Sequence, residues 1–202
     1  MKKIVKLIVA HDKTGIIGHG LDMPGWVMTD DLQDFSQKTK GEIVPVEGNP
    51  VIIGHNTALS ILKILGQPYP KRKTIVVSSR GDPLLEKAGC VVTKGENAFA
   101  DALVIANDSP GEELWIAGGG KIYAMAFALH IVDEIHRTIV LGTFPAKNPN
   151  DQIFFPEFDI TMFRKDRTRS KTFTQRQPKT NGEKDRGNSH NAEVSVYVRR
   201  VF

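Results

Sequence analysis

The chain has 202 residues and a formal net charge of +4, which suits one domain large enough to bury a real core. Hydrophobic residues make up 40% and charged residues 25%, which excludes a wholly disordered chain, and no apolar run approaches the roughly 20 residues of a membrane helix. The single cysteine, Cys90, excludes an intramolecular disulfide and a cysteine metal cluster. We therefore expect a cytoplasmic protein without a structural metal.

The predicted elements alternate along the chain. Apolar runs predict strands at 6–10, 50–54, 73–79, 89–93, 113–118, 132–140 and 192–202. Helical spacing of apolar residues predicts helices over 30–38, 57–65, 96–106 and 121–129. Strands alternating with helices, several of them continuously apolar, indicate an α/β fold with a mixed, mostly parallel twisted sheet flanked by helices.

The end of the chain predicts an antiparallel hairpin. Two long strand candidates flank the polar stretch from Thr174 to Asn191, so a mobile loop is expected at about 175–191. We take residues 1–202 as one domain. The basic tract from Arg164 to Arg186 holds much of the positive charge, and a solvated strand and loop is its first interpretation; a nucleic-acid-binding surface is the alternative.

Two adjacent acids, Asp30 and Asp31, stand where the first helix is predicted to begin. An acid in the first turn is favoured by the helix dipole, which explains one of them without any function. The other should turn inward with Leu32 and Phe35, where losing water is costly unless a partner donates hydrogen bonds. A ligand with paired N–H donors would meet that need.

Three strand ends look suited to anions. GHNTALSI (54–61) places a glycine and Thr57 at a helix start, SSRGD (78–82) places two hydroxyls and Arg80 after a strand, and IAGGGKIY (116–123) places three glycines before a helix. Each alone is consistent with an ordinary cap or tight turn, and the last is not the GxGxxG dinucleotide motif. Together they favour an extended, phosphorylated ligand across the carboxyl ends of the strands, such as a phosphorylated dinucleotide.

A family resemblance joins these segments. LIVAHDKTGIIGHGLDMPGW, DDLQDFSQKT, NPVIIGHNTALSI, PYPKRKTIVVSSR, LWIAGGGKIY and HRTIV follow the order and approximate spacing of dihydrofolate reductase, from about Lys6 to Asp159. The resemblance implies that fold, with NADPH as cofactor, dihydrofolate as substrate and a monomeric protein. It also implies hydride transfer to C6 and protonation at N5, giving tetrahydrofolate.

The resemblance also implies roles for particular residues. Asp31 resembles the carboxylate that accepts two hydrogen bonds from the pterin, Thr138 the hydroxyl that bonds this carboxylate, and Trp26 the indole that holds a water beside it; these three are the expected catalytic residues. Asp30 is then expected to face solvent. The expected substrate-binding residues are Ala10, Met28, Asp31, Phe35, Ile61, Arg72, which would clamp the glutamate carboxylate, and Thr138.

The expected cofactor-binding residues cluster at the three strand ends and the first turn. They are Ala10, Ile17, Gly18, Gly54, His55, Asn56, Thr57, Ser78, Ser79, Arg80, Ala117, Gly118, Gly119, Gly120, Lys121, Ile122 and Tyr123. In the family the first two glycines of the glycine turn are joined by a cis peptide, and the segment from Gly18 to Met28 corresponds to a loop that closes over the nicotinamide.

Several positions depart from the family pattern. Gly25 is inserted between Pro24 and Trp26, and His55 and Lys121 stand where the family often has a more strongly basic residue. A reductase of the same fold that acts on a pyrimidine intermediate of riboflavin synthesis remains an alternative. It would share the cofactor residues but would not need Asp31, Phe35 and Arg72 together.

Overall fold

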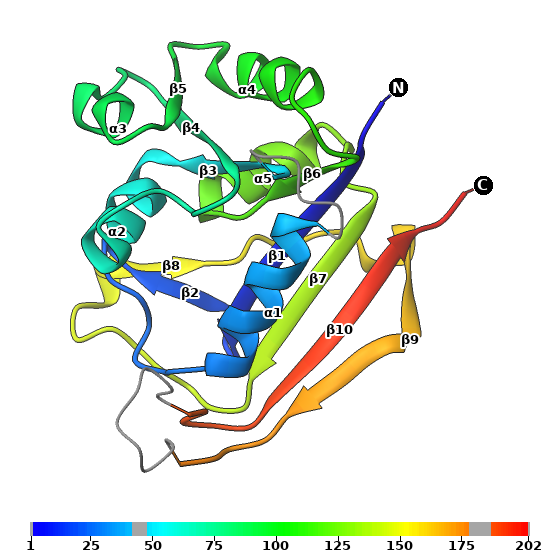
Figure 1. Cartoon of the computed structure of the whole chain (residues 1–202). Coiled ribbons are helices and arrows are strands. Elements are labelled where there is room, and N and C mark those ends of the chain that lie inside the picture. The colour runs from blue at the N-terminus through cyan, green and yellow to red at the C-terminus, as the bar shows by residue number, and fades with distance from the viewer. Residues whose placement is uncertain (1, 42–47, 178–186, 202) are drawn as a thin grey trace.

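The computed structural model describes residues 2–41, 48–177 and 187–201, and its centre is a twisted eight-stranded sheet (Figure 1). The strand order is β5-β4-β3-β6-β1-β7-β10-β9. The strands are β1 (Ile4–Asp12), β3 (Pro50–Gly54), β4 (Lys73–Ser78), β5 (Val91–Lys94), β6 (Glu113–Ile116), β7 (Glu134–Val140), β9 (Phe163–Phe173) and β10 (Ala192–Arg199). A separate pair joins β2 (Ile16–His19) to β8 (Gln152–Phe154).

Helices cover both faces of the sheet, as the apolar strands predict. The helices are α1 (Thr29–Lys40), α2 (His55–Leu65), α3 (Pro83–Lys87), α4 (Ala98–Asn107) and α5 (Gly120–Ala128), with short 3-10 turns at Pro149–Asp151 and Ile160–Met162. Helices α4 and α5 pack over the core that contains Leu7 and Ile116, whereas α2 and α3 pack over the opposite face, which contains Ile53 and Trp115. Figure 1 shows α1 lying across β1 and β7.

The register of the sheet brings the three glycine- and hydroxyl-bearing strand ends together. Strands β4, β3 and β6 are consecutive neighbours, and the pairs β3–β4 and β3–β6 are parallel. Their carboxyl ends therefore meet at one edge of the sheet. On the other side of β6, β1 pairs in parallel with β7, and Ala10 lies opposite Thr138.

The mixed sheet with its antiparallel end confirms the predicted fold class. Strand β10 runs antiparallel to both β7 and β9. Of the loop predicted at about 175–191, residues 178–186 lie outside the described part of the chain. The described flanks pair with each other, because Arg176 and Asn188 exchange two backbone hydrogen bonds of 3.0 and 3.1 Å.

Some predicted boundaries were wrong for local reasons. Helix α2 begins at His55 with Gly54 as its N-cap, so Thr57 lies within the first turn and does not cap the helix. Helix α3 was missed because it has only five residues, although Asp82 accepts hydrogen bonds from Leu84 N and Leu85 N and Pro83 opens it. Strands β2 and β8 are too short for a periodic signal.

Candidate functional site

Asp31 and Thr138 form the polar centre of the candidate site. Asp31 lies in the first turn of α1, and the Thr138 hydroxyl on β7 donates a 2.6 Å hydrogen bond to Asp31 Oδ1. Within the described residues, Oδ2 of Asp31 has no protein hydrogen-bond partner. The pKa of the Asp31 carboxyl is raised, because burial outweighs the Thr138 hydrogen bond and the neighbouring Asp34 carboxylate adds repulsion.

Asp30, which was expected to face solvent, is partly exposed, with 29% of its side chain accessible, and its carboxylate is paired. Arg176 Nη2 donates to Asp30 Oδ1 at 2.6 Å, and Asn188 Nδ2 donates to Asp30 Oδ2 at 2.6 Å. The two adjacent acids are therefore divided between two tasks. Asp30 is engaged by the end of the chain, while Asp31 turns toward β7.

Arg72 lies beside two aromatic rings, Phe35 on α1 and Tyr69, which contact each other with centroids 5.0 Å apart. Its guanidinium carbon is 5.8 Å from the Phe35 ring centroid and 5.2 Å from that of Tyr69, and Nη1 donates to the Thr39 hydroxyl at 2.9 Å. Burial lowers the pKa of Arg72, and its buried Nε has no hydrogen-bond partner within the described residues. An arginine held this way has donor capacity left for a carboxylate.

The apolar residues predicted around Asp31 differ in exposure. Ile61 is buried on α2, whereas Leu32, expected to turn inward with Phe35, is 57% exposed. Met28 is only 2% exposed and packs in a cluster with Val140 and Phe173. Trp26 packs against this cluster and meets the Phe144 ring edge-on at 5.1 Å. Met28 therefore offers little surface to a ligand.

The glycine turn after β6 is too tight for side chains. A Cβ at Gly119 would lie 3.1 Å from Thr57 Oγ1, and one at Gly120 would lie 2.9 Å from the Phe154 carbonyl oxygen. Gly118 has a φ of +121°, which favours glycine, and the Gly118–Gly119 peptide is cis, as the resemblance implies. Gly54 N donates to Gly118 O at 2.7 Å, which ties the end of β3 directly to this turn.

Two helix N-termini meet at this turn. Neither α2, which begins after Gly54, nor α5, which begins after Gly119, has a side-chain cap. The first N–H groups of a helix lack intrahelical partners and carry the positive end of the helix dipole. The starts of α2 and α5, together with Thr57 in the first turn of α2 and the adjacent Gly118, are thus suited to an anion such as a diphosphate.

The third strand end is partly occupied by its own contacts. Ser78 Oγ accepts hydrogen bonds from Gly81 N at 3.1 Å and Arg80 N at 3.4 Å, which builds a turn, while Ser79 and Arg80 are exposed. His55 Nε2 lies 2.8 Å from Asp82 Oδ2. Sequence reasoning missed Asp82, whose carboxylate both caps α3 and engages His55.

The other predicted cofactor residues stand on β1, β2, α2 and α5 or on the turn after β6. Tyr123 on α5 is buried and donates from its hydroxyl to Ile8 O at 2.8 Å, and burial raises its pKa. Ile17 and Gly18 lie on β2, and Ala10 lies on β1. Asn56 and Lys121 occupy the first turns of α2 and α5, Ala117 joins β6 to the glycine turn, and Ile122 follows on α5.

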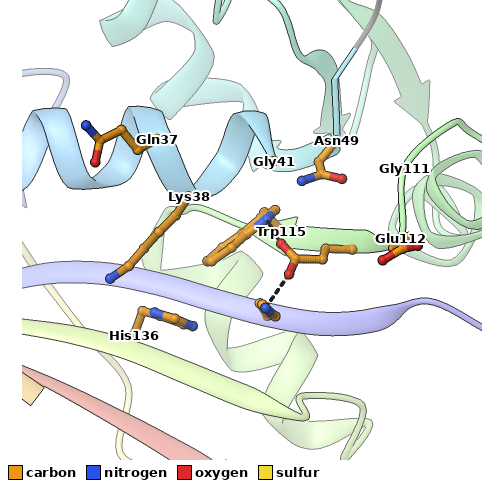
Figure 2. A pocket seen from close by; sticks show the side chains of 10 residues that line it. Gln37, Lys38, Gly41, Asn49, Gly111, Glu112, Trp115 and His136 are labelled. Atoms are coloured by element: carbon orange, nitrogen blue, oxygen red, sulfur yellow. Dashed lines mark hydrogen bonds and ion pairs between the residues drawn. The ribbon is translucent and has the colours of Figure 1, made fainter. Parts of the chain in front are cut away.

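A pocket of about 700 Å³ lies elsewhere, at the amino ends of β1, β6 and β7 (Figure 2). It is lined by Lys6, Gln37, Lys38, Gly41, Asn49, Gly111, Glu112, Glu113, Trp115 and His136. Figure 2 shows Lys38 extending from α1 toward His136. Lys6 pairs with Glu113, and Lys38 Nζ lies 2.6 Å from Asp34 Oδ2, so the charges are compensated internally. This pocket contains none of the predicted site residues.

Within residues 2–41, 48–177 and 187–201, no three His, Cys, Asp or Glu side chains gather so that they could hold a metal ion. No helix described in the structure is both long and apolar enough to cross a membrane.

Three residues that were not predicted as site residues also contact Arg72 or Asp30. Tyr69, which contacts Arg72, lies in the segment PYPKRKTIVVSSR but was not among the predicted site residues. Arg176 and Asn188, which contact Asp30, stand in none of the motif segments. Only the folded chain brings them to α1.

Comparisons with known proteins agree on one family. The family profile described as "Dihydrofolate reductase" matches residues 4–199. The chain is 32% identical to the dihydrofolate reductase of Bacillus subtilis over 156 residues, which cover 77% of each chain. It is 34% identical to that of Mycobacterium leprae over 126 residues, 62% of this chain and 67% of the relative.

The fold is also similar to that of a solved dihydrofolate reductase. A solved structure of dihydrofolate reductase from Enterococcus faecalis, complexed with NADP(H) and RAB-propyl, superposes with a TM-score of 0.72 at 24% identity, and the match covers 100% of both chains. At that identity the likeness supports the fold.

Proposed function

Because this chain belongs to the dihydrofolate reductase family, we propose that it reduces 7,8-dihydrofolate to 5,6,7,8-tetrahydrofolate with NADPH. The observation that carries the proposal is the Asp31–Thr138 pair on α1 and β7, in the same molecule as the anion-suited turn where β3 and β6 end. Hydride transfer to a pterin needs a buried carboxylate and a dinucleotide site but no protein nucleophile.

The residues present fit a dinucleotide cofactor. The tight turn at Gly118–Gly120 and the uncapped starts of α2 and α5 would hold the diphosphate. His55, Arg80 and Lys121 would face the 2′-phosphate, and the backbone of Ala10 and Ile17 the carboxamide. When bound, NADPH supplies the hydride for C6 of the pterin, and NADP⁺ is left.

Asp31 would orient the pterin. Its two carboxylate oxygens would accept hydrogen bonds from the 2-amino group and the adjacent ring nitrogen, while Thr138 keeps Oδ1 in place. Burial raises the pKa of Asp31 because it disfavours the ionised carboxylate. A protonated, positively charged pterin would stabilise that ionised form. The proton for N5 would come from water, and Asp31 would favour its arrival by its charge.

The rest of the substrate would extend along α1. Phe35 and Ile61 would contact the pterin and benzoyl rings from α1 and α2. Arg72 would bind the glutamate carboxylate with its guanidinium, whose hydrogen bonds within the described residues all come from Nη1. A cytoplasmic location and a monomeric state stay predictions.

The experiment is the loss of reduced-nicotinamide absorbance when purified protein meets NADPH and dihydrofolate. We expect folate-dependent oxidation, faster with NADPH than with NADH. Mixtures without folate control for oxidase activity. If protein with an intact near-UV circular dichroism spectrum oxidises neither NADPH nor NADH, the proposal is contradicted. That result would favour the pyrimidine reductase of the same fold, which would then be assayed with its own substrate.

A further inference from the structure

Helix α1 begins without a cap of its own. Its N-cap residue is Met28, whose side chain makes no capping hydrogen bond. Instead Thr29 N donates to Gly187 O at 3.2 Å, and Asp30 N donates to Asn188 Oδ1 at 3.1 Å. The Thr29 hydroxyl also donates to Gly187 O at 2.7 Å. The first turn of α1 is therefore capped by residues from the far end of the chain.

Asn188 is suited to this task by its planar amide. The residue is 0% exposed, and while its Oδ1 accepts from the helix, its Nδ2 donates to Asp30 Oδ2 at 2.6 Å and to Thr174 O at 3.0 Å. Its backbone is fixed by the two hydrogen bonds to Arg176. One side chain thus offers an acceptor and two donors in a fixed geometry, which neither a carboxylate nor a hydroxyl provides.

Arg176 completes the arrangement from the other strand of the terminal hairpin. Its Nη2 lies 2.6 Å from Asp30 Oδ1, so both carboxylate oxygens of Asp30 are bound by residues near the end of the chain. The residue after Asp30 is Asp31. Since both lie in one helical turn, the orientation of that turn also fixes where the Asp31 carboxylate stands relative to Thr138.

We propose that Asn188 is a positioning residue for Asp31: it caps α1, clamps Asp30 and so holds the Asp31 carboxylate in its place against Thr138. The inference rests on the proposed function for the catalytic consequence, whereas the cap itself is independent of any activity. Displacement of a reacting group by about 1 Å can cost roughly 100-fold in rate.

The test compares Asn188→Ala with a matched control, Asn191→Ala. Asn191 belongs to the same connection and its Oδ1 accepts from Gln175 N at 2.6 Å, but no hydrogen bond joins its side chain to α1. We expect Asn188→Ala to lower kcat about 10- to 100-fold, with the KM for NADPH unchanged. In the ligand-free protein, amide exchange of Thr29 and Asp30 should become faster. Asn191→Ala should do neither.

A rescue separates positioning from a general loss of stability. Asn188→Asp keeps the acceptor for Asp30 N but places a second carboxylate against Asp30, so kcat should fall at least as far. Adding Asp30→Asn restores one donor and one acceptor between the pair, and kcat should recover at least fivefold. A merely destabilised protein would not recover, and the pair of variants remains informative if Asn188→Ala fails to fold.

Wild-type kcat in Asn188→Ala, an equal loss in Asn191→Ala, or no recovery in the double variant would each overturn the inference. An inactive wild-type protein would overturn the proposed function instead, and with it the catalytic consequence of the cap. The two failures are therefore distinguishable in one set of assays.

Discussion

Asp31 and Asp34 lie one turn apart on α1, yet their surroundings move the two carboxyl pKa values in opposite directions. Burial raises the pKa of Asp31 despite the Thr138 hydrogen bond. Burial also acts on Asp34, but hydrogen bonds of 2.6 Å from both Lys171 and Lys38 prevail and lower its pKa. The helix therefore carries one carboxylate that opposes folding at neutral pH and one that favours it.

We predict that Asp31→Asn lowers turnover while it stabilises the fold. The raised pKa means that ionisation is less favourable in the folded chain than in the unfolded one, so above the ordinary carboxyl range the charge lowers the free energy of unfolding. Removing the charge should therefore raise that free energy at pH 7. Turnover should fall on the order of 100-fold and recover partly in acid, where the pterin protonates unaided.

Urea unfolding and steady-state assays across pH 3–8 would check both effects. The stability difference should vanish as pH falls below the ordinary carboxyl pKa of about 3.9. Asp34→Asn is the control, and it should destabilise at neutral pH because the pKa of Asp34 is lowered. Undiminished turnover in Asp31→Asn would remove Asp31 from its proposed role.

At the scale of elements, Glu134 joins three strands through one carboxylate. It lies on β7, accepts hydrogen bonds from His136 and from Arg169 on β9, at 3.2 and 2.9 Å, and stands 3.7 Å from Lys6 on β1. The His136 hydrogen bond, partly opposed by burial and assisted by Arg169 and Lys6, lowers the pKa of Glu134 to about 2.

We predict that Glu134→Gln destabilises the sheet in a pH-dependent manner. A lowered pKa gives stability above the unfolded carboxyl pKa, which is lost as pH falls toward 2. At pH 7 the free energy of unfolding should drop by about 2 kcal/mol, and near pH 2 the variant and wild type should coincide. Denaturant melts at the two pH values measure this. Glu112→Gln, at an exposed position, is the control; an equal loss there would argue against the strand-joining role.

Elements with strong local signals could be predicted, and those built by distant contacts could not. The run PVIIG predicted β3 at its observed bounds, because a continuous apolar run is typical of a strand covered on both faces. Four of its five residues are indeed buried. The glycines at 118–120 likewise predicted a tight turn before a helix. Asn188, in contrast, stands in a polar stretch and becomes a cap only when β10 pairs with β7. The helical spacing of Leu32 predicted that it would turn inward with Phe35. Leu32 is exposed instead, because spacing alone does not show which elements pack against a helix face.

At the scale of the whole molecule, the described part of the basic tract from Arg164 to Arg186 contributes three cations that pair with the protein's own acids. Arg169 pairs with Glu134, Lys171 with Asp34 and Arg176 with Asp30. Cations already paired release few counterions from a nucleic acid, so they add little to its binding.

We predict no nucleic-acid binding at physiological salt. A shift assay with labelled single- and double-stranded DNA and RNA at micromolar protein would check this, with a known basic binding protein as the positive control. A salt-sensitive shift at 150 mM would contradict the prediction and revive the alternative interpretation of the tract.

The cap on α1 also sets the order in which parts of the protein can form during synthesis. Asp30 is joined to a residue 158 positions further along the chain. A ribosome that has made α1, most of the sheet and the glycine turn still holds a helix whose first turn is unfinished, because Asn188 has not yet been added. Contacts between residues so far apart in sequence also form slowly during folding, because a long loop must close before they can be made. A nascent chain can therefore be mostly folded well before the Asp31 carboxylate is held in place, because that step awaits the last part of the chain.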